Sequence, residues 1–97
     1  MKSGLSRSKK IAAIAEAAGI PCMVGSMGEF GIGTAAGVHF AISTPAVKFA
    51  CEIGSTHLVD DVVEGNPYNH QPPDLAWPLP RGSGLGITLK PQYARAT

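Results

Sequence analysis

The sequence has little of what several specialised classes of protein require. It holds 8 lysines and arginines against 7 acidic residues, for a net charge of +1, which argues against nucleic acid as the main partner. Its 2 cysteines, Cys22 and Cys51, lack the spacing of a metal site or a disulfide framework, and we expect free thiols packed in a core. No apolar run is long enough to cross a membrane, and no apolar segment follows the basic N-terminus. We therefore expect a cytoplasmic protein without a membrane partner.

Apolar residues make up 44% of the 97 residues, enough for one small folded domain. Ile11 and Ile14 begin an apolar stripe at helical spacing, and Gly19 is a typical helix end. The preceding polar residues predict a loop, from which Ser6 or Ser8 caps the helix.

A second helix and two apolar runs complete the predicted pattern. Residues 20–24 and 47–51 have strand length and show no polar alternation, which is typical of parallel strands buried on both faces. Small residues between them predict a helix over residues 34–42, which Pro45 ends. Repeated helix–strand units of this kind predict an α/β fold. Residues 1–55 contain these units, and residues 56–97 are rich in glycine, proline and other turn formers.

Two carboxylates follow the predicted strands. Glu52 ends the second strand abruptly, and Glu29 lies in the glycine-rich loop after the first. Functional groups of α/β enzymes gather at the carboxyl ends of strands, so Glu52 is a candidate site residue rather than a solvated surface glutamate. Glu29 is either a site residue or a partner of the next helix's N-terminus.

The stretch from Gly31 to Ala36 matches the G-x-G-x-x-A form of a dinucleotide fingerprint. Glu52 follows Gly33 by 19 positions, close to the spacing of a ribose-binding acid. The loop before Gly31 is longer than the true motif allows. A small α/β module that binds a nucleotide or another anion at the Gly31–Gly33 loop therefore stays an alternative to an enzyme.

The three histidines do not have metal-ligand spacing. His39 lies between apolar residues on the second predicted helix, which favours a packed, hydrogen-bonded side chain. His57 is either exposed or part of a site, and His70 lies in a proline-rich loop where we expect it to be solvated.

Four segments together resemble the late barrel of the mandelate racemase and muconate lactonizing enzymes of the enolase superfamily. They are KIAAIAEAAGI (10–20), GSMGEFGIGT (25–34), CEIG (51–54) and GSGLGITL (82–89). The last resembles the family's closing P-G-L-G-V-x-L segment, with Ser83 where proline is usual. The resemblance covers nearly the whole chain.

The resemblance implies a fold and a chemistry. The fold is a modified (β/α) TIM-type barrel with a separate capping domain, of which this chain is a C-terminal fragment of about two helix–strand units. The parent is a metal-dependent racemase, epimerase, cycloisomerase or dehydratase. It removes the proton α to a substrate carboxylate and stabilises the enediolate on a divalent metal, usually Mg²⁺. The parent's partner is a small carboxylate, and we expect the parent to be a homo-oligomer.

The resemblance also places individual residues. The family's metal ligands and catalytic lysines lie on earlier strands, so we expect no metal ligand, no bound cofactor and no activity in this chain alone. Lys2 stands three positions after the family's lysine and is not expected to be catalytic. Glu52 is carried over as the catalytic, substrate-side carboxylate. Ser26, Met27 and Glu29 are expected to line the substrate site.

Overall fold

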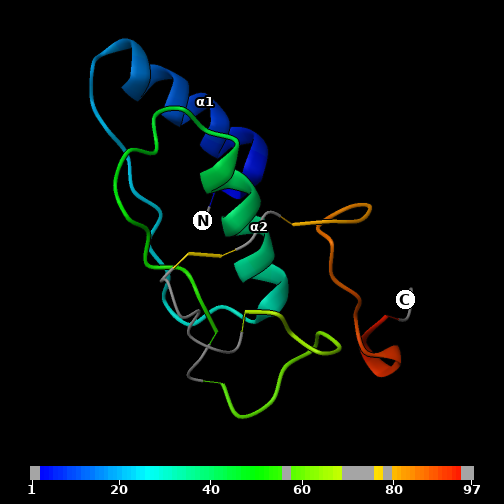
Figure 1. The fold of residues 1–97 in the computed structure, drawn as a ribbon. Coiled ribbons are helices and arrows are strands. Elements are labelled where there is room, and N and C mark those ends of the chain that lie inside the picture. The colour runs from blue at the N-terminus through cyan, green and yellow to red at the C-terminus, as the bar shows by residue number, and fades with distance from the viewer. Residues whose placement is uncertain (1–2, 56–57, 69–75, 78–79, 95–97) are drawn as a thin grey trace.

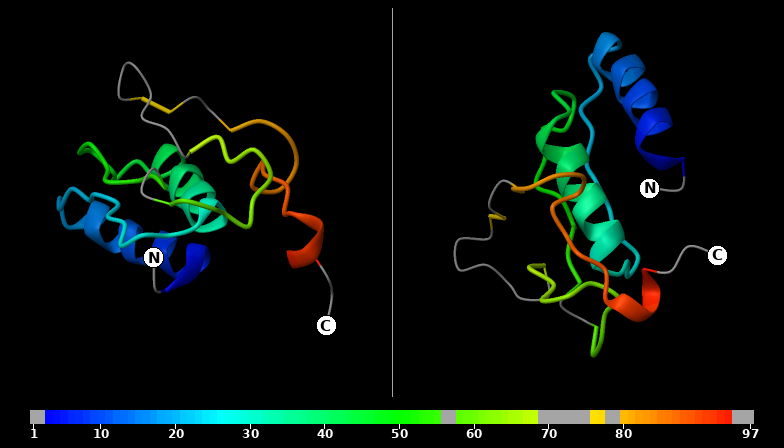
Figure 2. Two further views of the ribbon diagram at one scale, coloured as in Figure 1. Left: turned by 90° about the horizontal axis from the view of Figure 1, so that it is seen from below. Right: turned by 90° about the vertical axis from the view of Figure 1, so that its right-hand side faces the viewer.

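The computed structural model describes residues 3–55, 58–68, 76–77 and 80–94. These residues form two α-helices, α1 (Gly4–Ala17) and α2 (Gly31–Ile42), and the short 3₁₀ helix η1 (Pro91–Tyr93). Figure 1 shows α1 and α2 side by side, with the C-terminal segment passing along α2. In the right-hand view of Figure 2 both helices run in the same general direction, and each is followed by an extended segment that returns alongside it.

The prediction of two regular strands is wrong within the described residues. Residues 20–24 and 47–51 form one isolated parallel bridge, between Cys22 and Val47. The Cys22 amide donates to the Ala46 carbonyl at 2.7 Å, and the Lys48 amide donates to the Cys22 carbonyl at 3.2 Å. The predicted parallel direction is therefore present, but the pairing is too short for a sheet.

The pairing stops because the second segment bulges outward after Lys48. In a regular parallel ladder the Val24 carbonyl would accept a bond from Ala50. Instead it accepts from the Glu52 amide at 2.9 Å, two residues further along. The Val24 amide meets the Cys51 sulfur at 3.4 Å in place of a carbonyl. This bulge aligns Glu52 with the end of the first segment.

Helix α1 starts earlier than its sequence pattern predicts. It begins at Gly4, so the predicted loop and the cap by Ser6 or Ser8 are wrong. Ser3 occupies the N-cap position and its hydroxyl shares a 2.7 Å hydrogen bond with the hydroxyl of Ser8. The two serines satisfy each other, and neither hydroxyl caps a backbone amide of the helix.

The predicted glycine stop of α1 is confirmed. Gly19 has a φ of +71°, its amide donates to the Glu16 carbonyl at 3.0 Å, and the Ile20 amide donates to the Ala15 carbonyl at 2.8 Å. This is the Schellman arrangement, which satisfies carbonyls left over at a helix end. The left-handed backbone explains why a glycine is needed there.

Helix α2 begins at Gly31, three residues before the predicted start at Thr34. It is the most buried element of the described chain, and its buried residues are Gly31, Thr34, Ala35, Gly37, Val38 and Phe40. Phe40 joins one core cluster, with Ala12, Val24 and Ala46. The opposite side of α2 joins a second cluster, in which Ala35, Val38 and Tyr68 are buried against Trp77, Leu85 and Ile87.

The second cluster exists because the later part of the chain folds back on α2. Val63 and Leu89 form an antiparallel bridge, and the Glu64 amide donates to the Thr88 carbonyl at 2.8 Å. Just before Leu89 the chain turns at Gly86. A Cβ at this position would lie 2.5 Å from the carbonyl oxygen of Arg81. The packing of Tyr68, Leu85 and Ile87 against α2 crosses the predicted boundary between residues 55 and 56, a division that stays a prediction.

None of the described helices is long and apolar enough to cross a membrane.

Candidate functional site

The candidate site begins where the two extended segments meet. Because the Glu52 amide bonds to the Val24 carbonyl at 2.9 Å, the residues that follow Val24 and those that follow Glu52 lie at the same edge. Ser26 and Glu29 come after the first segment, and Ile53 comes after the second. The structure therefore brings Ser26 and Glu29 to the same edge as the backbone of Glu52.

Glu29 is held by its own loop. The Ser26 hydroxyl donates a short hydrogen bond to Oε2 of Glu29, and the Met27 amide donates to the same oxygen at 3.3 Å. Chiefly because of the Ser26 bond, the pKa of the Glu29 carboxyl is lowered from its usual value. Hydrogen bonds to the charged form have this effect, so Glu29 is an anion at neutral pH.

Two of the predicted site residues point to solvent. Met27 is 98% exposed, and the Glu52 side chain is exposed as well. Neither side chain lines the cavity described next, although Ile53, the neighbour of Glu52, does. Their assigned roles therefore stay predictions.

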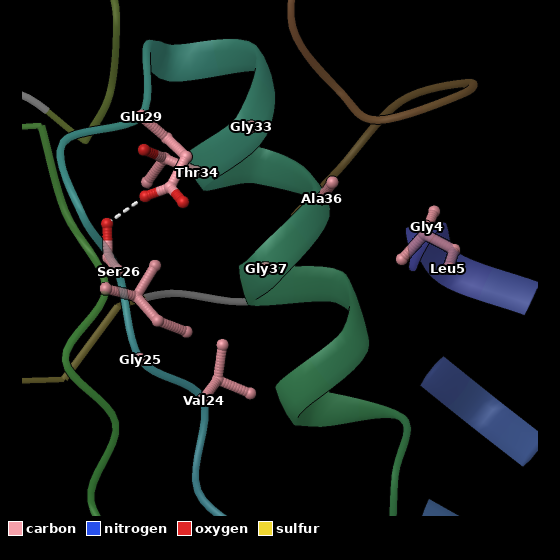
Figure 3. Close-up of a pocket in the computed structure, with 11 residues that line it drawn as sticks. Gly4, Leu5, Val24, Gly25, Ser26, Glu29, Gly33, Thr34, Ala36 and Gly37 are labelled. Carbon is pink, nitrogen blue, oxygen red and sulfur yellow. Dashed lines mark hydrogen bonds between the residues drawn. The ribbon is translucent and has the colours of Figure 1, made fainter. Parts of the chain in front are cut away.

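A cavity of about 340 Å³ lies beside Ser26 and Glu29, between the first extended segment and the helices (Figure 3). Its wall combines the start of α1, the segment after residue 23 and the first turns of α2. The lining residues are Gly4, Leu5, Val24, Gly25, Ser26, Glu29, Gly33, Thr34, Ala36, Gly37 and Ile53.

Thr34 is a site residue that sequence reasoning missed. It is 2% exposed, lines the cavity, and its hydroxyl oxygen makes no hydrogen bond. Most buried polar groups in proteins have a partner. The only indication in the sequence was its place beside the glycine-rich stretch, which the motif analysis read as part of a nucleotide fingerprint.

The glycines of that stretch are required for close contacts. A Cβ on Gly33 would lie 2.9 Å from Cγ of Glu29, and a Cβ on Gly31 would lie 2.7 Å from Nδ2 of Asn66. Both glycines lie inside α2 rather than in a loop before it. Their role in this structure is to let Glu29 and Asn66 lie against the first turn of the helix.

A buried hydrogen-bond network joins the start of α2 to the later chain. Oδ2 of Asp61 accepts from the Gly31 amide at 2.8 Å and from Nδ2 of Asn66 at 2.6 Å. Nδ2 of Asn66 also donates to the Ser55 hydroxyl at 2.7 Å, and Oδ1 of Asn66 accepts from the Tyr68 amide at 2.9 Å. We call Asp61, Asn66 and Ser55 the Asp61 network. It satisfies a helix N-terminus with a carboxylate from a distant part of the sequence.

The Asp61 network bears on the alternative function. An anion-binding module at the Gly31–Gly33 loop needs free amides at the start of the helix. The Gly31 amide already bonds to the carboxylate of Asp61, a negative charge that would repel a phosphate. The structure therefore gives no support to a nucleotide site at this position.

The predictions for the other reactive side chains can be compared with the structure. Cys22 and Cys51 are free thiols packed against the first core cluster, as predicted. Nε2 of His39 lies 2.9 Å from the Leu85 carbonyl oxygen, which confirms a hydrogen-bonded structural histidine. His57 and His70 lie outside the described residues.

The described residues do not fit a magnesium site. They contain no group of three or more histidine, cysteine, aspartate or glutamate side chains able to hold a metal ion. Mg²⁺ prefers several oxygen ligands in octahedral geometry. Here Glu29 bonds to its own loop, and Asp61 is used by its network.

A packed helix between two parallel segments, with polar groups after their carboxyl ends, is the local architecture of an α/β-barrel enzyme. Residues 1–93 match the family described as enolase C-terminal domain-like. The chain belongs to this family, that of the mandelate racemase and muconate lactonizing enzymes, as the resemblance implied.

Several curated proteins are similar to the chain. Muconate cycloisomerase 1 of Rhodococcus opacus is 37% identical over 86 residues, which is 89% of this chain and 22% of that protein. The L-Lys-D/L-Arg epimerase of Methylococcus capsulatus is 45% identical over 62 residues, 64% of this chain and 17% of that protein. The L-Ala-D/L-Glu epimerase of Thermotoga maritima is 47% identical over 65 residues, 67% of this chain and 19% of that protein.

The chain thus spans about a fifth of the length of these relatives. No solved structure matches it significantly.

Proposed function

We propose that this chain is the C-terminal part of the barrel of a metal-dependent racemase, epimerase, cycloisomerase or dehydratase. The enzyme removes the proton α to the carboxylate of a small substrate. Family membership over residues 1–93 and the names of the relatives, cycloisomerases and epimerases, support this proposal.

The observation that carries the proposal is the 2.9 Å hydrogen bond from the Glu52 amide to the Val24 carbonyl. It joins the backbone of Glu52 to the end of the segment that leads into the loop of Ser26 and Glu29, although more than twenty residues separate Glu52 from that loop in sequence. An enzyme of the α/β-barrel class needs this convergence of strand ends.

Each residue has a proposed role. Glu52, exposed at the junction, hydrogen-bonds or polarises the acid substrate in the transition state. Ser26 and Glu29 form a preorganised pair in the cavity wall, and Met27 covers the substrate from the solvent side. This chain is assigned no metal ligand, and Mg²⁺ chemistry is proposed only for the parent enzyme.

We expect the chain alone to be inactive. It is assigned no metal ligand, and without a metal ion nothing stabilises the negative charge that develops on the enediolate. The test is a chimera in which this chain replaces the matching C-terminal segment of the L-Ala-D/L-Glu epimerase of T. maritima. A folded chimera that epimerises L-Ala-L-Glu supports the proposal.

Within that chimera, Glu52→Gln should lower kcat/KM about 10²-fold, or about 2.7 kcal/mol of transition-state stabilisation. Glu64→Gln is the matched control, because Glu64 is also exposed and is not among the residues that line the cavity. Equal kcat/KM for the two variants would show that Glu52 is only a surface residue.

A further inference from the structure

We propose that the cavity beside Glu29 binds an ammonium group carried on a short apolar chain. If the proposed function is right, this group is the end of the substrate remote from its reacting carboxylate. The assignment as substrate rests on the proposed function, whereas the binding of the ammonium group does not.

The charge of the cavity is the first argument. Among the lining residues that the structure describes, Glu29 carries the only ionisable side chain, and none is lysine, arginine or histidine. Hydrogen bonds from Ser26 and the Met27 amide keep Glu29 in its charged form. A cavity with one fixed negative charge favours a cation and repels a carboxylate.

The second argument is the unpartnered hydroxyl of Thr34. A threonine in a helix commonly bonds to the carbonyl four residues earlier, but this hydroxyl is buried and has no hydrogen bond. Figure 3 shows Thr34 beside Glu29 and Ser26 on the same side of α2. An ammonium group has three donors, so one such group can serve both the Glu29 carboxylate and the Thr34 oxygen.

The third argument is that the backbone is shaped for this pair. The Cβ of any residue but glycine at position 33 would lie 2.9 Å from Cγ of Glu29. Gly33 therefore lets the glutamate lie across the first turn of α2, toward Thr34. The carboxylate is positioned before any ligand arrives, which lowers the entropic cost of binding.

The other lining residues determine which kind of group can carry the ammonium. Leu5, Val24 and Ile53 supply an apolar surface, and glycines and Ala36 supply most of what is left. A volume of about 340 Å³ is at the small end of the range for small-molecule sites. The cavity thus suits a short aliphatic amine. For the enzyme, this selects substrates with an amine besides the reacting carboxylate over dicarboxylates.

The test is a titration of the 97-residue chain, labelled with ¹⁵N, with n-butylammonium, n-butanol and butyrate in low salt. We expect saturable amide shifts at residues 24–29 and 33–37 with butylammonium in the millimolar range. Butanol should bind at least tenfold more weakly, and butyrate should cause no saturable shift there. Equal affinity for butylammonium and butyrate would overturn the proposal.

Variants separate the groups involved. Glu29→Gln should lower butylammonium affinity at least tenfold to the level of butanol, and Thr34→Val should lower it a few-fold. Gly33→Ala should reduce it by displacing Glu29, while Glu64→Gln, outside the cavity, should leave it unchanged. An unchanged affinity in Glu29→Gln contradicts the proposal.

If the amide spectrum shows that the chain or a variant is unfolded, inhibition of the chimera replaces the titration. Butylammonium should then inhibit the chimera competitively, and Glu29→Gln should relieve the inhibition. No inhibition overturns the proposal. The two hypotheses fail separately. A chimera that is active yet insensitive to butylammonium sinks the cavity proposal alone, and an inactive chimera beside a chain that binds butylammonium sinks the proposed function alone.

Discussion

Helices α1 and α2 have similar lengths, but α1 is mostly exposed whereas α2 is largely buried. Helix α1 buries only Ser8 and Ala12, while its isoleucines Ile11 and Ile14 are 59% and 71% exposed. Helix α2 buries half of its residues, on two sides. The apolar stripe predicted from the sequence of α1 exists, but most of it faces solvent.

The difference lies in what packs against each helix. The later chain folds back over α2, fastens its N-terminus with the Asp61 network, and adds the second core cluster. Helix α1 meets α2 in the first core cluster, where Ala12 and Phe40 are buried, and Nζ of Lys9 donates to the hydroxyl of Ser43, just after α2, at 2.8 Å. Helix stability in proteins comes mainly from tertiary packing. We therefore expect α2 to be more stable against local unfolding than α1.

Removing the Asp61 carboxylate should reduce the difference in stability between α2 and α1 most strongly. Asp61→Ala leaves the Gly31 amide, the Val63 amide and one donor of Asn66 without their acceptor. Burying unpaired polar groups is costly, so we expect a loss of about 3 kcal/mol, measured by urea unfolding followed by circular dichroism.

The matched control is Ser3→Ala at the start of α1, where the serine side chain caps no amide and only partners the hydroxyl of Ser8. We expect a loss of about 1 kcal/mol. A similar loss in both variants would mean that the start of α2 is no better secured than that of α1.

A pair of apolar substitutions sharpens the contrast. Val38→Ala on α2, at 3% exposure, should cost about 2 kcal/mol. Ile14→Lys on α1 should change stability by less than about 0.5 kcal/mol and should reduce association at high protein concentration, because exposed apolar surface promotes it. Sedimentation at several concentrations measures the second effect, and an unchanged or increased association would contradict it.

Local patterns predicted the parts of this fold that depend on neighbouring residues. The Gly19 stop, the existence of both helices, the free thiols and the hydrogen-bonded, structural role of His39 all follow from short-range spacing. The family was recognisable from the same segments. Bounds were less accurate at Gly31, since glycines are poor helix formers and their role in close contacts with Glu29 and Asn66 is not visible in the sequence.

Contacts between distant residues could not be predicted. The isolated bridge at Cys22 falls short of a strand because the partner segment bulges after Lys48, which no pattern of apolar residues reveals. Asp61 reaches Gly31 across 30 residues, and Thr34 is left unpartnered only because of how the surrounding chain packs. Of the polar side chains that line the cavity, Ser26 and Glu29 were named from the sequence and Thr34 was not, while the roles of Glu52 and Met27 stay predictions.

The smallest effect concerns an exposed pair in the later chain. Nζ of Lys90 lies 2.5 Å from Oδ1 of Asp60, and this bond lowers the pKa of the Asp60 carboxyl and raises the pKa of the Lys90 ammonium. The contribution of Asp60 is present at neutral pH and lost as pH falls below the usual aspartate value. The contribution of Lys90 is lost as pH rises above the usual lysine value. Because both groups are solvent-screened, Asp60→Asn should flatten the acid limb of stability only slightly, and 1 M salt should abolish the difference; a salt-resistant difference would contradict a surface pair.

Amide hydrogen exchange of the isolated chain tests the central claim most directly: α2 is secured by its own later chain, whereas α1 lacks the partner surface that the rest of a barrel would supply. We expect amides of residues 35–40 to exchange at least about tenfold more slowly than those of residues 11–15, with a broad thermal transition. Equal, slow exchange in both helices and across residues 20–24 and 47–51, in a monomer with a sharp cooperative melt, would contradict the account and show a self-sufficient domain.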